Sequence, residues 1–306
     1  MLNWLTAQVH HQLLNNKSDV GGLRQLCLIH PTRMNHETIL ESSSGLFGPI
    51  SIRETSHASI RLMKINNEIE GQVFTSPDSA KFHCKVHGPG AVSASRYLYG
   101  FIIPAWQFSK ARGLILGLGA GAGVAMLLAL FPQLSLMVVE IDSEVIRLAR
   151  RNFPLIQFYE DQGRLDIVQS DAEAYLDYCQ DSFAFTLLDL FAGDESSSHN
   201  ASLIDKTLKI SPCFMANMIT SQSMHSTFQR SLYLQKQPFL MWLSASSTIR
   251  PTENVNWMLT NMHSLSPEIQ DYQLFDSSLQ AHPNVITANQ YFRYILSQVE
   301  AACFYR

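Results

Sequence analysis

Three acidic residues stand at the ends of segments that are predicted to be buried β-strands. Glu140 ends the run SLMVVE, Asp171 follows DIVQS, and Asp189 follows FTLL. In a doubly wound sheet the carboxyl ends of the strands share one edge, so residues distant in the sequence meet in one crevice. Carboxylates in such a crevice can accept hydrogen bonds, hold a cation or take up a proton. The spacing therefore predicts a single acidic binding site.

A glycine-rich segment precedes the first of these acids. The sequence GLILGLGAGAGVAMLLALFP predicts a buried strand, a turn with Gly117, Gly119, Gly121 and Gly123, and an apolar helix. Glycine lets the turn approach a ligand closely, and the start of the helix offers unpaired N–H groups. Glu140, at the end of the next strand, can accept hydrogen bonds from both hydroxyls of a ribose. These features predict the nucleoside-binding half of an α/β fold.

The other two acids suggest how the rest of a nucleoside cofactor could be bound. Asp171 and the backbone N–H of Ala172 can pair with an adenine edge, whose amino group donates and whose ring nitrogens accept. Asp189 faces the expected reacting end, where a carboxylate can stabilise a cation or take a proton from an attacking amine. A nicotinamide dehydrogenase also binds ribose through an acid but has no required role for Asp171 and Ala172. It is therefore the third choice of function.

The elements that position these residues form an α/β domain. Strands alternate with helices over residues 91–306, which predicts a Rossmann-like, doubly wound and mostly parallel sheet with helices on both faces. Residues 51–90 predict a small antiparallel β domain, with a period-two run at 59–65 and a turn at Asn66-Asn67. Residues 1–50 are an N-terminal segment to which the pattern assigns no role.

Composition excludes several functional classes. The 306 residues are 46% hydrophobic and 16% charged, with a formal net charge of -4, which disfavours nonspecific binding to nucleic acid or an anionic membrane. The five cysteines include no CxxC pair, and the chain start has no signal-peptide pattern. We therefore expect a cytoplasmic protein whose partner is a small-molecule acceptor, with a homodimer as its assembly, and neither nucleic acid nor a membrane as partner.

The order of GLGAGAG, VVEID, QSDAEAYL and LLDLFAGD resembles the spermidine synthase-like branch of the S-adenosylmethionine-dependent methyltransferase superfamily. The small β domain and the segment RYLYGF ahead of the first core strand agree with that family's layout. The resemblance implies a class I methyltransferase type of fold, with S-adenosylmethionine or decarboxylated S-adenosylmethionine as cofactor. By residue, it implies Gly117, Gly119 and Gly121 around the amino acid or aminopropyl tail, Glu140 on ribose, Asp171 and Ala172 on adenine, and Asp189 at the catalytic position.

The chain also departs from the aminopropyltransferases of that family. Their GGGDG loop carries an aspartate that holds an ammonium group, and this chain has Ala120 at that position. Tyr97-Leu98-Tyr99 replaces a tyrosine-histidine-glutamate run, and the segment from Asp189 to Asp194 replaces a DSSDP-like loop. Burying the ammonium groups of a polyamine needs paired carboxylates, whereas methyl transfer needs an aligned sulfonium and at most one base. Methyl transfer therefore ranks above aminopropyl transfer.

The leading hypothesis is thus an S-adenosylmethionine-dependent methyltransferase with an unidentified acceptor, in which Asp189 is the general base or orienting carboxylate. Tyr97 and Asp194 are the residues expected to contact the substrate. The alternative is a polyamine aminopropyltransferase that uses decarboxylated S-adenosylmethionine. A noncatalytic nucleotide-sensing or interaction module is the alternative from another class. No metal site is expected, because strand alternation would put His83 and His87 on one face and Cys84 on the other, so the three cannot converge on one ion.

Overall fold

The computed structural model describes residues 37–55, 60–75, 96–190, 201–221, 240–243 and 254–261. All described residues belong to one unit of the chain, Glu37–Arg306. The predictions for Asp194, His83, Cys84 and His87 lie outside the described residues. None of the helices in these ranges combines the length and the apolar character that crossing a bilayer requires.

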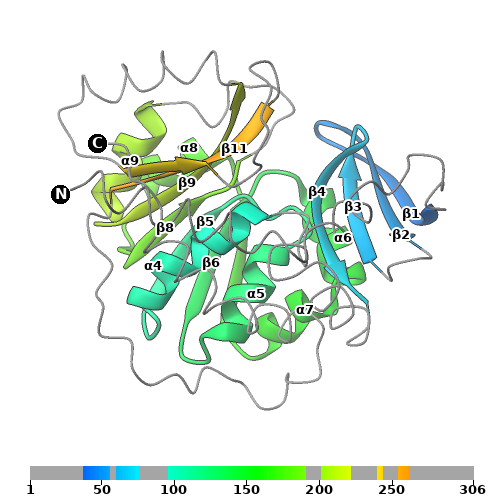
Figure 1. The fold of residues 1–306 in the computed structure, drawn as a ribbon. Coiled ribbons are helices and arrows are strands. Elements are labelled where there is room, and N and C mark those ends of the chain that lie inside the picture. The colour runs from blue at the N-terminus through cyan, green and yellow to red at the C-terminus, as the bar shows by residue number, and fades with distance from the viewer. Residues whose placement is uncertain are drawn as a thin grey trace, which may run out of the picture. The chain divides into compact units, whose positions relative to one another are not determined.

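A four-stranded antiparallel sheet, here called sheet A, precedes the α/β domain (Figure 1). Its strands follow the order of the sequence: β1 (Glu37–Gly45), β2 (Gly48–Thr55), β3 (Ile60–Ile65) and β4 (Glu68–Phe74). The predicted turn at Asn66-Asn67 is confirmed, and both residues have positive φ, as tight hairpin turns require. The sheet begins at Glu37, upstream of residue 51. The sequence pattern did not reveal β1 because no side chain on that strand is fully buried.

The α/β domain is built on a seven-stranded sheet, here called sheet B, with the order β10-β11-β9-β8-β5-β6-β7. The strands from β9 to β7 are parallel, whereas β11 is antiparallel to both β9 and β10. The predicted doubly wound, mostly parallel sheet is therefore confirmed. The strands are β5 (Arg112–Leu116), β6 (Ser135–Glu140), β7 (Leu165–Gln169), β8 (Phe185–Leu188), β9 (Phe214–Ser221), β10 (Leu240–Leu243) and β11 (Asn254–Thr260).

Helices cover both faces of sheet B (Figure 1). On one face α4, α5, α6 and α7 share a hydrophobic core with sheet A, and on the other face α8 and α9 form a second core. The helices are η2 (Arg96–Phe101, a 3-10 helix), α4 (Ile102–Gln107), α5 (Ala122–Leu130), α6 (Ser143–Asn152), α7 (Pro154–Asp161), α8 (Ala172–Tyr178) and α9 (Ala201–Ile210). The strand order reverses between β5 and β8, which is where ligands bind in such folds.

The sequence of each helix suits its place. Helix α5 is apolar on all sides and its residues from Val124 to Leu130 are buried, as expected for a helix enclosed by other elements. Helix α6 is amphipathic, with Val145 and Leu148 buried and arginines in its last turn, where they complement the helix dipole. Helix α7 starts with Pro154 at a position that needs no N–H donor.

The Asp142 carboxylate joins sheet A to the α/β domain. This buried side chain accepts hydrogen bonds from the backbone N–H of Glu144 at 2.8 Å and of Leu46 at 2.6 Å. It therefore caps α6 from the N-cap position, where the backbone of Asp142 is extended. Glu41 of β1 adds ion pairs with Arg147 and Arg151 of α6.

We expect Asp142→Ala to lower the free energy of unfolding by about 3 kcal/mol, because it removes a helix cap and leaves the Leu46 N–H without its acceptor. Asp142→Asn should cost less, since its amide oxygen still accepts one bond. The matched control is Asp171→Ala, which removes the exposed N-cap of α8 alone and should cost about 1 kcal/mol. Urea denaturation measures all three variants. Equal losses for the two alanine variants would contradict the bridging role.

Candidate functional site

The glycine loop, residues 117–121, connects β5 to α5 at the switch point of sheet B. Gly117, Gly119 and Gly121 have φ values of 98°, 53° and 71°, which lie in the left-handed region. A Cβ atom on Gly117 would collide with the backbone carbonyl of Asp189, and one on Gly119 would lie 2.5 Å from the carbonyl oxygen of Glu70. Glycine is thus required in this loop for two reasons. The backbone angles are left-handed, and the segments that carry Asp189 and Glu70 leave no room for a Cβ.

Glu140 lies at the end of β6 with its carboxylate against this loop. Its Oε2 accepts a hydrogen bond from the Leu118 N–H at 2.9 Å, and its Oε1 accepts one from the Asp142 N–H at 3.0 Å. Burial raises the pKa of Glu140, and these backbone donors oppose the rise. Each oxygen has a further lone pair, so the carboxylate can also accept from two hydroxyl groups of a ligand.

Asp189 follows β8 on the other side of the switch point. Its backbone N–H donates to the carbonyl of Leu116 at 2.9 Å, and its Oδ1 accepts from Nδ2 of Asn217 at 3.0 Å. Asn217 is buried on β9, and its Oδ1 has no hydrogen-bond partner in the structure. The hydrogen bond from Asn217 therefore orients the Asp189 carboxylate. A carboxylate that acts as a general acid or base needs such a fixed orientation.

Glu70 of β4 is a third carboxylate at the loop, which the sequence analysis missed. The backbone of Glu70 contacts Gly119, and the pKa of this partly buried side chain is raised to about 8. Burial is the main cause, followed by the charges of Asp189, Glu140 and Glu68. The only signal in the sequence was an acid within the strand pattern EIEGQVF, and that pattern does not reveal what the strand packs against.

Asp171 and Ala172 lie where β7 ends and α8 begins, next to β6. Oδ1 of Asp171 accepts from the Ala174 N–H at 2.9 Å and so caps α8, while the backbone N–H of Ser170 donates to the carbonyl of Glu140 at 3.0 Å. Asp171 is exposed and Ala172 is buried. Their role in adenine binding stays a prediction. Tyr97 lies in η2, and its contact with a substrate stays a prediction as well.

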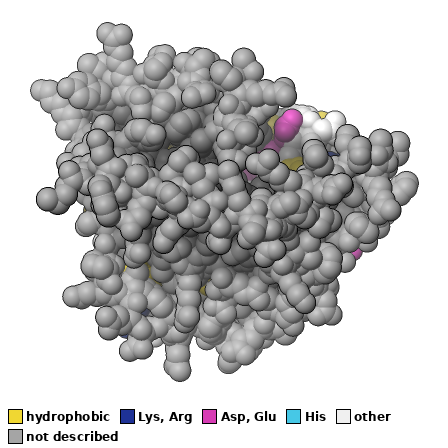
Figure 2. Space-filling model, viewed as in Figure 1, with side chains coloured by type: hydrophobic (Ala, Val, Ile, Leu, Met, Phe, Trp, Pro, Cys, Tyr) yellow, Lys and Arg dark blue, Asp and Glu magenta, His cyan; other side chains and the backbone are white. Residues whose placement is uncertain are grey.

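The structure thus brings Glu140 and Asp189 together around the glycine loop and adds Glu70. Among the residues that the structure describes, no set of three His, Cys, Asp or Glu side chains is arranged to hold a metal ion. Where described residues reach the face shown in Figure 2, acidic and hydrophobic side chains stand beside one another. A glycine loop with a hydrogen-bond-accepting acid at one end and further carboxylates near it fits a nucleoside that carries a cationic group.

Comparison with solved structures supports this fold. The chain is 19% identical to a probable spermidine synthase from Corynebacterium glutamicum, over 73% of this chain and 80% of that one, with a TM-score of 0.55. It is 13% identical to spermidine synthase from Thermotoga maritima and to a spermidine synthase in complex with the transition-state analogue AdoDATO, in each case over 86% of this chain and 88% of the other. The TM-scores are 0.51 and 0.50.

No protein-family model matches the chain, and no curated protein does. At these identities the shared feature is the fold, which is the class I methyltransferase type with a preceding antiparallel sheet.

We expect Glu70→Gln to change how stability depends on pH. The folded protein keeps Glu70 protonated up to a pKa of about 8, whereas the unfolded chain loses this proton near 4.5, so wild-type stability falls as pH rises between these values. The difference in free energy of unfolding between Glu70→Gln and wild type should therefore be about 1–3 kcal/mol more in favour of the variant at pH 9 than at pH 5. This range is reduced because Glu70 is partly exposed. Thermal denaturation across pH measures this. The exposed Glu68→Gln is the control, and a similar pH dependence in both variants would contradict the assignment.

Proposed function

We propose that this protein is an S-adenosylmethionine-dependent transferase that moves a methyl group to a small-molecule acceptor. The observation that carries the proposal is the hydrogen bond between Oε2 of Glu140 and the Leu118 N–H, at 2.9 Å. This bond places Glu140, the acid expected to bind a ribose, against the glycine loop. The loop has left-handed glycines and lies at the switch point of sheet B. The fold shared with spermidine synthases supports a cofactor of this kind.

The residues have distinct roles in this proposal. Glu140 accepts from the ribose hydroxyls, Asp171 and Ala172 bind adenine, and the glycine loop surrounds the tail of the cofactor. The bound cofactor supplies a methyl group on a positively charged sulfonium. Asp189, held in direction by Asn217, orients the acceptor or takes its proton.

Aminopropyl transfer from decarboxylated S-adenosylmethionine is the second candidate, and Glu70 favours it. The carboxylate of Glu70 belongs to a residue that packs on Gly119, next to Ala120 of the loop. An ionised Glu70 can hold the ammonium group of an aminopropyl tail, as the loop aspartate of aminopropyltransferases does. The structural neighbours named spermidine synthases support this candidate through their shared fold alone.

We expect the protein to bind S-adenosylhomocysteine about tenfold or more tightly than its 2′-deoxy analogue, because a carboxylate that accepts from a hydroxyl contributes about 1.5 kcal/mol or more. In Glu140→Gln this preference should fall to about threefold or less, since an amide offers one acceptor atom. Calorimetric titration measures both ligands on both proteins. Comparing two ligands on each protein separates ribose recognition from any change in the loop itself. A preference that persists unchanged in the variant would refute the role of Glu140.

We expect pH to act oppositely on the two cofactor forms. As pH rises through about 8, Glu70 ionises. S-Adenosylmethionine, whose tail carries a carboxylate, should then bind about fivefold more weakly, and the decarboxylated form, whose tail carries only an ammonium, about fivefold more tightly. Glu70→Gln should remove both trends, and Glu68→Gln should keep them. Product analysis in the same samples identifies the reaction: S-adenosylhomocysteine supports methyl transfer, and 5′-methylthioadenosine overturns it in favour of aminopropyl transfer.

A further inference from the structure

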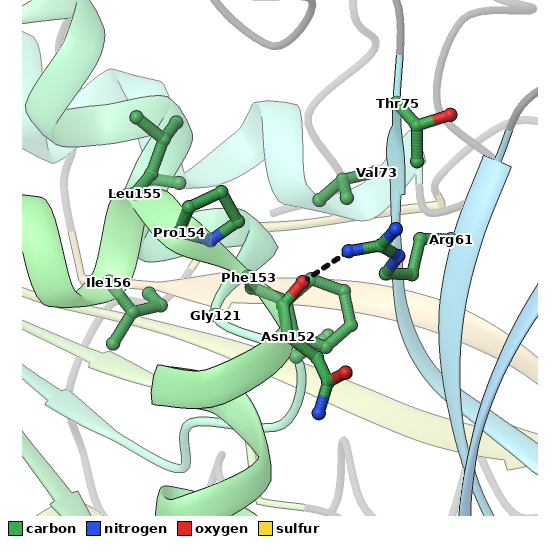
Figure 3. A pocket seen from close by; sticks show the side chains of 11 residues that line it. Arg61, Val73, Thr75, Gly121, Asn152, Phe153, Pro154, Leu155 and Ile156 are labelled. Carbon is green, nitrogen blue, oxygen red and sulfur yellow. Dashed lines mark hydrogen bonds between the residues drawn. The ribbon is translucent and has the colours of Figure 1, made fainter. Parts of the chain in front are cut away.

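A cavity of about 140 Å³ lies between sheet A and the glycine loop (Figure 3). The cavity is bordered by Val73 of β4, by Ala120 and Gly121 of the loop, and by Phe153 together with the first turn of α7, Pro154–Ile156. The carboxylates of the candidate site do not line this cavity. It is therefore a second concave site, which shares the glycine loop and strand β4 with the first.

Three polar residues line the cavity, Arg61, Thr75 and Asn152, and the side chains of Arg61 and Asn152 donate hydrogen bonds within the protein. Nε and Nη2 of Arg61 donate to Oε2 of Glu54 at 3.2 and 2.8 Å, and Nη1 donates to the backbone carbonyl of Asn152 at 3.0 Å, the bond drawn in Figure 3. The amide of Asn152 donates to Glu41 and to the carbonyl of Leu148. Arg61 disfavours a cation here, and its pairing with Glu54 removes the attraction for an anion. The cavity therefore suits an uncharged occupant.

The size of the cavity sets the size of that occupant. Alanine, valine, leucine and isoleucine side chains supply most of its wall, together with Phe153 and Pro154. An apolar cavity of about 150 Å³ in another protein binds benzene or xenon. The present cavity is partly open to solvent, so a ring of about six carbon atoms would fit the space and bury part of its apolar surface against these side chains.

We propose that this cavity is a binding site for a small, uncharged apolar molecule about the size of a benzene ring, and that its occupant stabilises the glycine loop. The occupant would contact Ala120 and Gly121, and the carbonyl of Gly121 accepts from the Ala125 N–H at 2.9 Å in the first turn of α5. The same loop bonds Glu140 through Leu118. A stabilised loop should in turn bind the cofactor more tightly; this coupling rests on the proposed function, whereas the binding site in the cavity does not.

Methyl NMR with benzene as the probe tests the binding site. Benzene should shift the methyl signals of Ala120, Ala125 and Ile156 in a saturable way. Benzoate and benzylamine, which are charged, should bind at least about tenfold more weakly because their charge gains no partner in the cavity. An absence of saturable shifts, or an equal response to the charged molecules, overturns the proposal.

Two variants locate the binding. Ala125→Leu fills the cavity and should abolish the benzene response, whereas Ala174→Leu, the same change on α8, should leave it intact. Leu155→Ala enlarges the cavity and should strengthen binding of toluene relative to benzene by about fourfold, the value of one additional buried methyl group. This gain is measurable even if Ala125→Leu does not fold. Equal benzene binding by the two leucine variants, or no gain in Leu155→Ala, places the ligand elsewhere and overturns the proposal.

Titration of S-adenosylmethionine with and without saturating benzene tests the coupling. Benzene should increase cofactor affinity about threefold or more, and the cofactor should increase benzene affinity by the same factor. An unchanged affinity overturns the coupling. If no cofactor binds at all, the proposed function fails, while the methyl shifts and the Leu155→Ala gain still decide whether the cavity is a site.

Discussion

The close approach of two backbone segments to the glycine loop is the constraint on which the site depends. The carbonyl of Asp189 and the carbonyl of Glu70 both lie where a Cβ on the loop would stand, at Gly117 and Gly119 respectively. Leu118, between these glycines, donates to Glu140. Three successive loop residues thus contact segments from β8, β6 and β4. Side chains at the two glycine positions would push these segments apart and separate the carboxylates that the site needs.

Sheet A is part of this constraint because it carries β4. Two contacts away from the glycine loop hold sheet A in place. Asp142 accepts a hydrogen bond from the turn between β1 and β2, and Glu41 of β1 forms an ion pair with Arg147 of α6. Ile50 and Met63 of sheet A also join the core formed by α5 and α7. These contacts partly bury Glu70 and bring it near the other carboxylates, and its pKa rises to about 8, mainly because of burial and then because of those charges. The position of sheet A therefore determines the pKa of a carboxylate in the site.

The sequence predicted the parts of this arrangement that depend on local patterns. Apolar runs that end in acids identified β6 and β8, and the glycine loop after β5 identified the switch point, because burial of a parallel strand leaves a continuous apolar run. Glu70 could not be predicted, since its role comes from the packing of β4 on a loop far along the chain. Asp171 shows the converse: a strand-end acid can also cap a helix, and the sequence pattern is the same for both roles.

The relation between Ala120 and Glu70 changes how the absence of a loop aspartate should be interpreted. A Cβ on Gly71, the residue after Glu70, would lie 2.7 Å from Cβ of Ala120, so β4 occupies the space that a longer side chain at position 120 would require. The carboxylate near the loop is instead that of Glu70, which precedes Gly71 on β4. Its raised pKa gives it two chemical forms near neutral pH. A protonated Glu70 can donate a hydrogen bond to the carboxylate of an amino acid tail, whereas an ionised Glu70 repels that carboxylate and attracts an ammonium. In the proposed transferase, the choice between the two cofactor forms would therefore depend on the protonation of one residue of sheet A, and alanine in the loop is compatible with either.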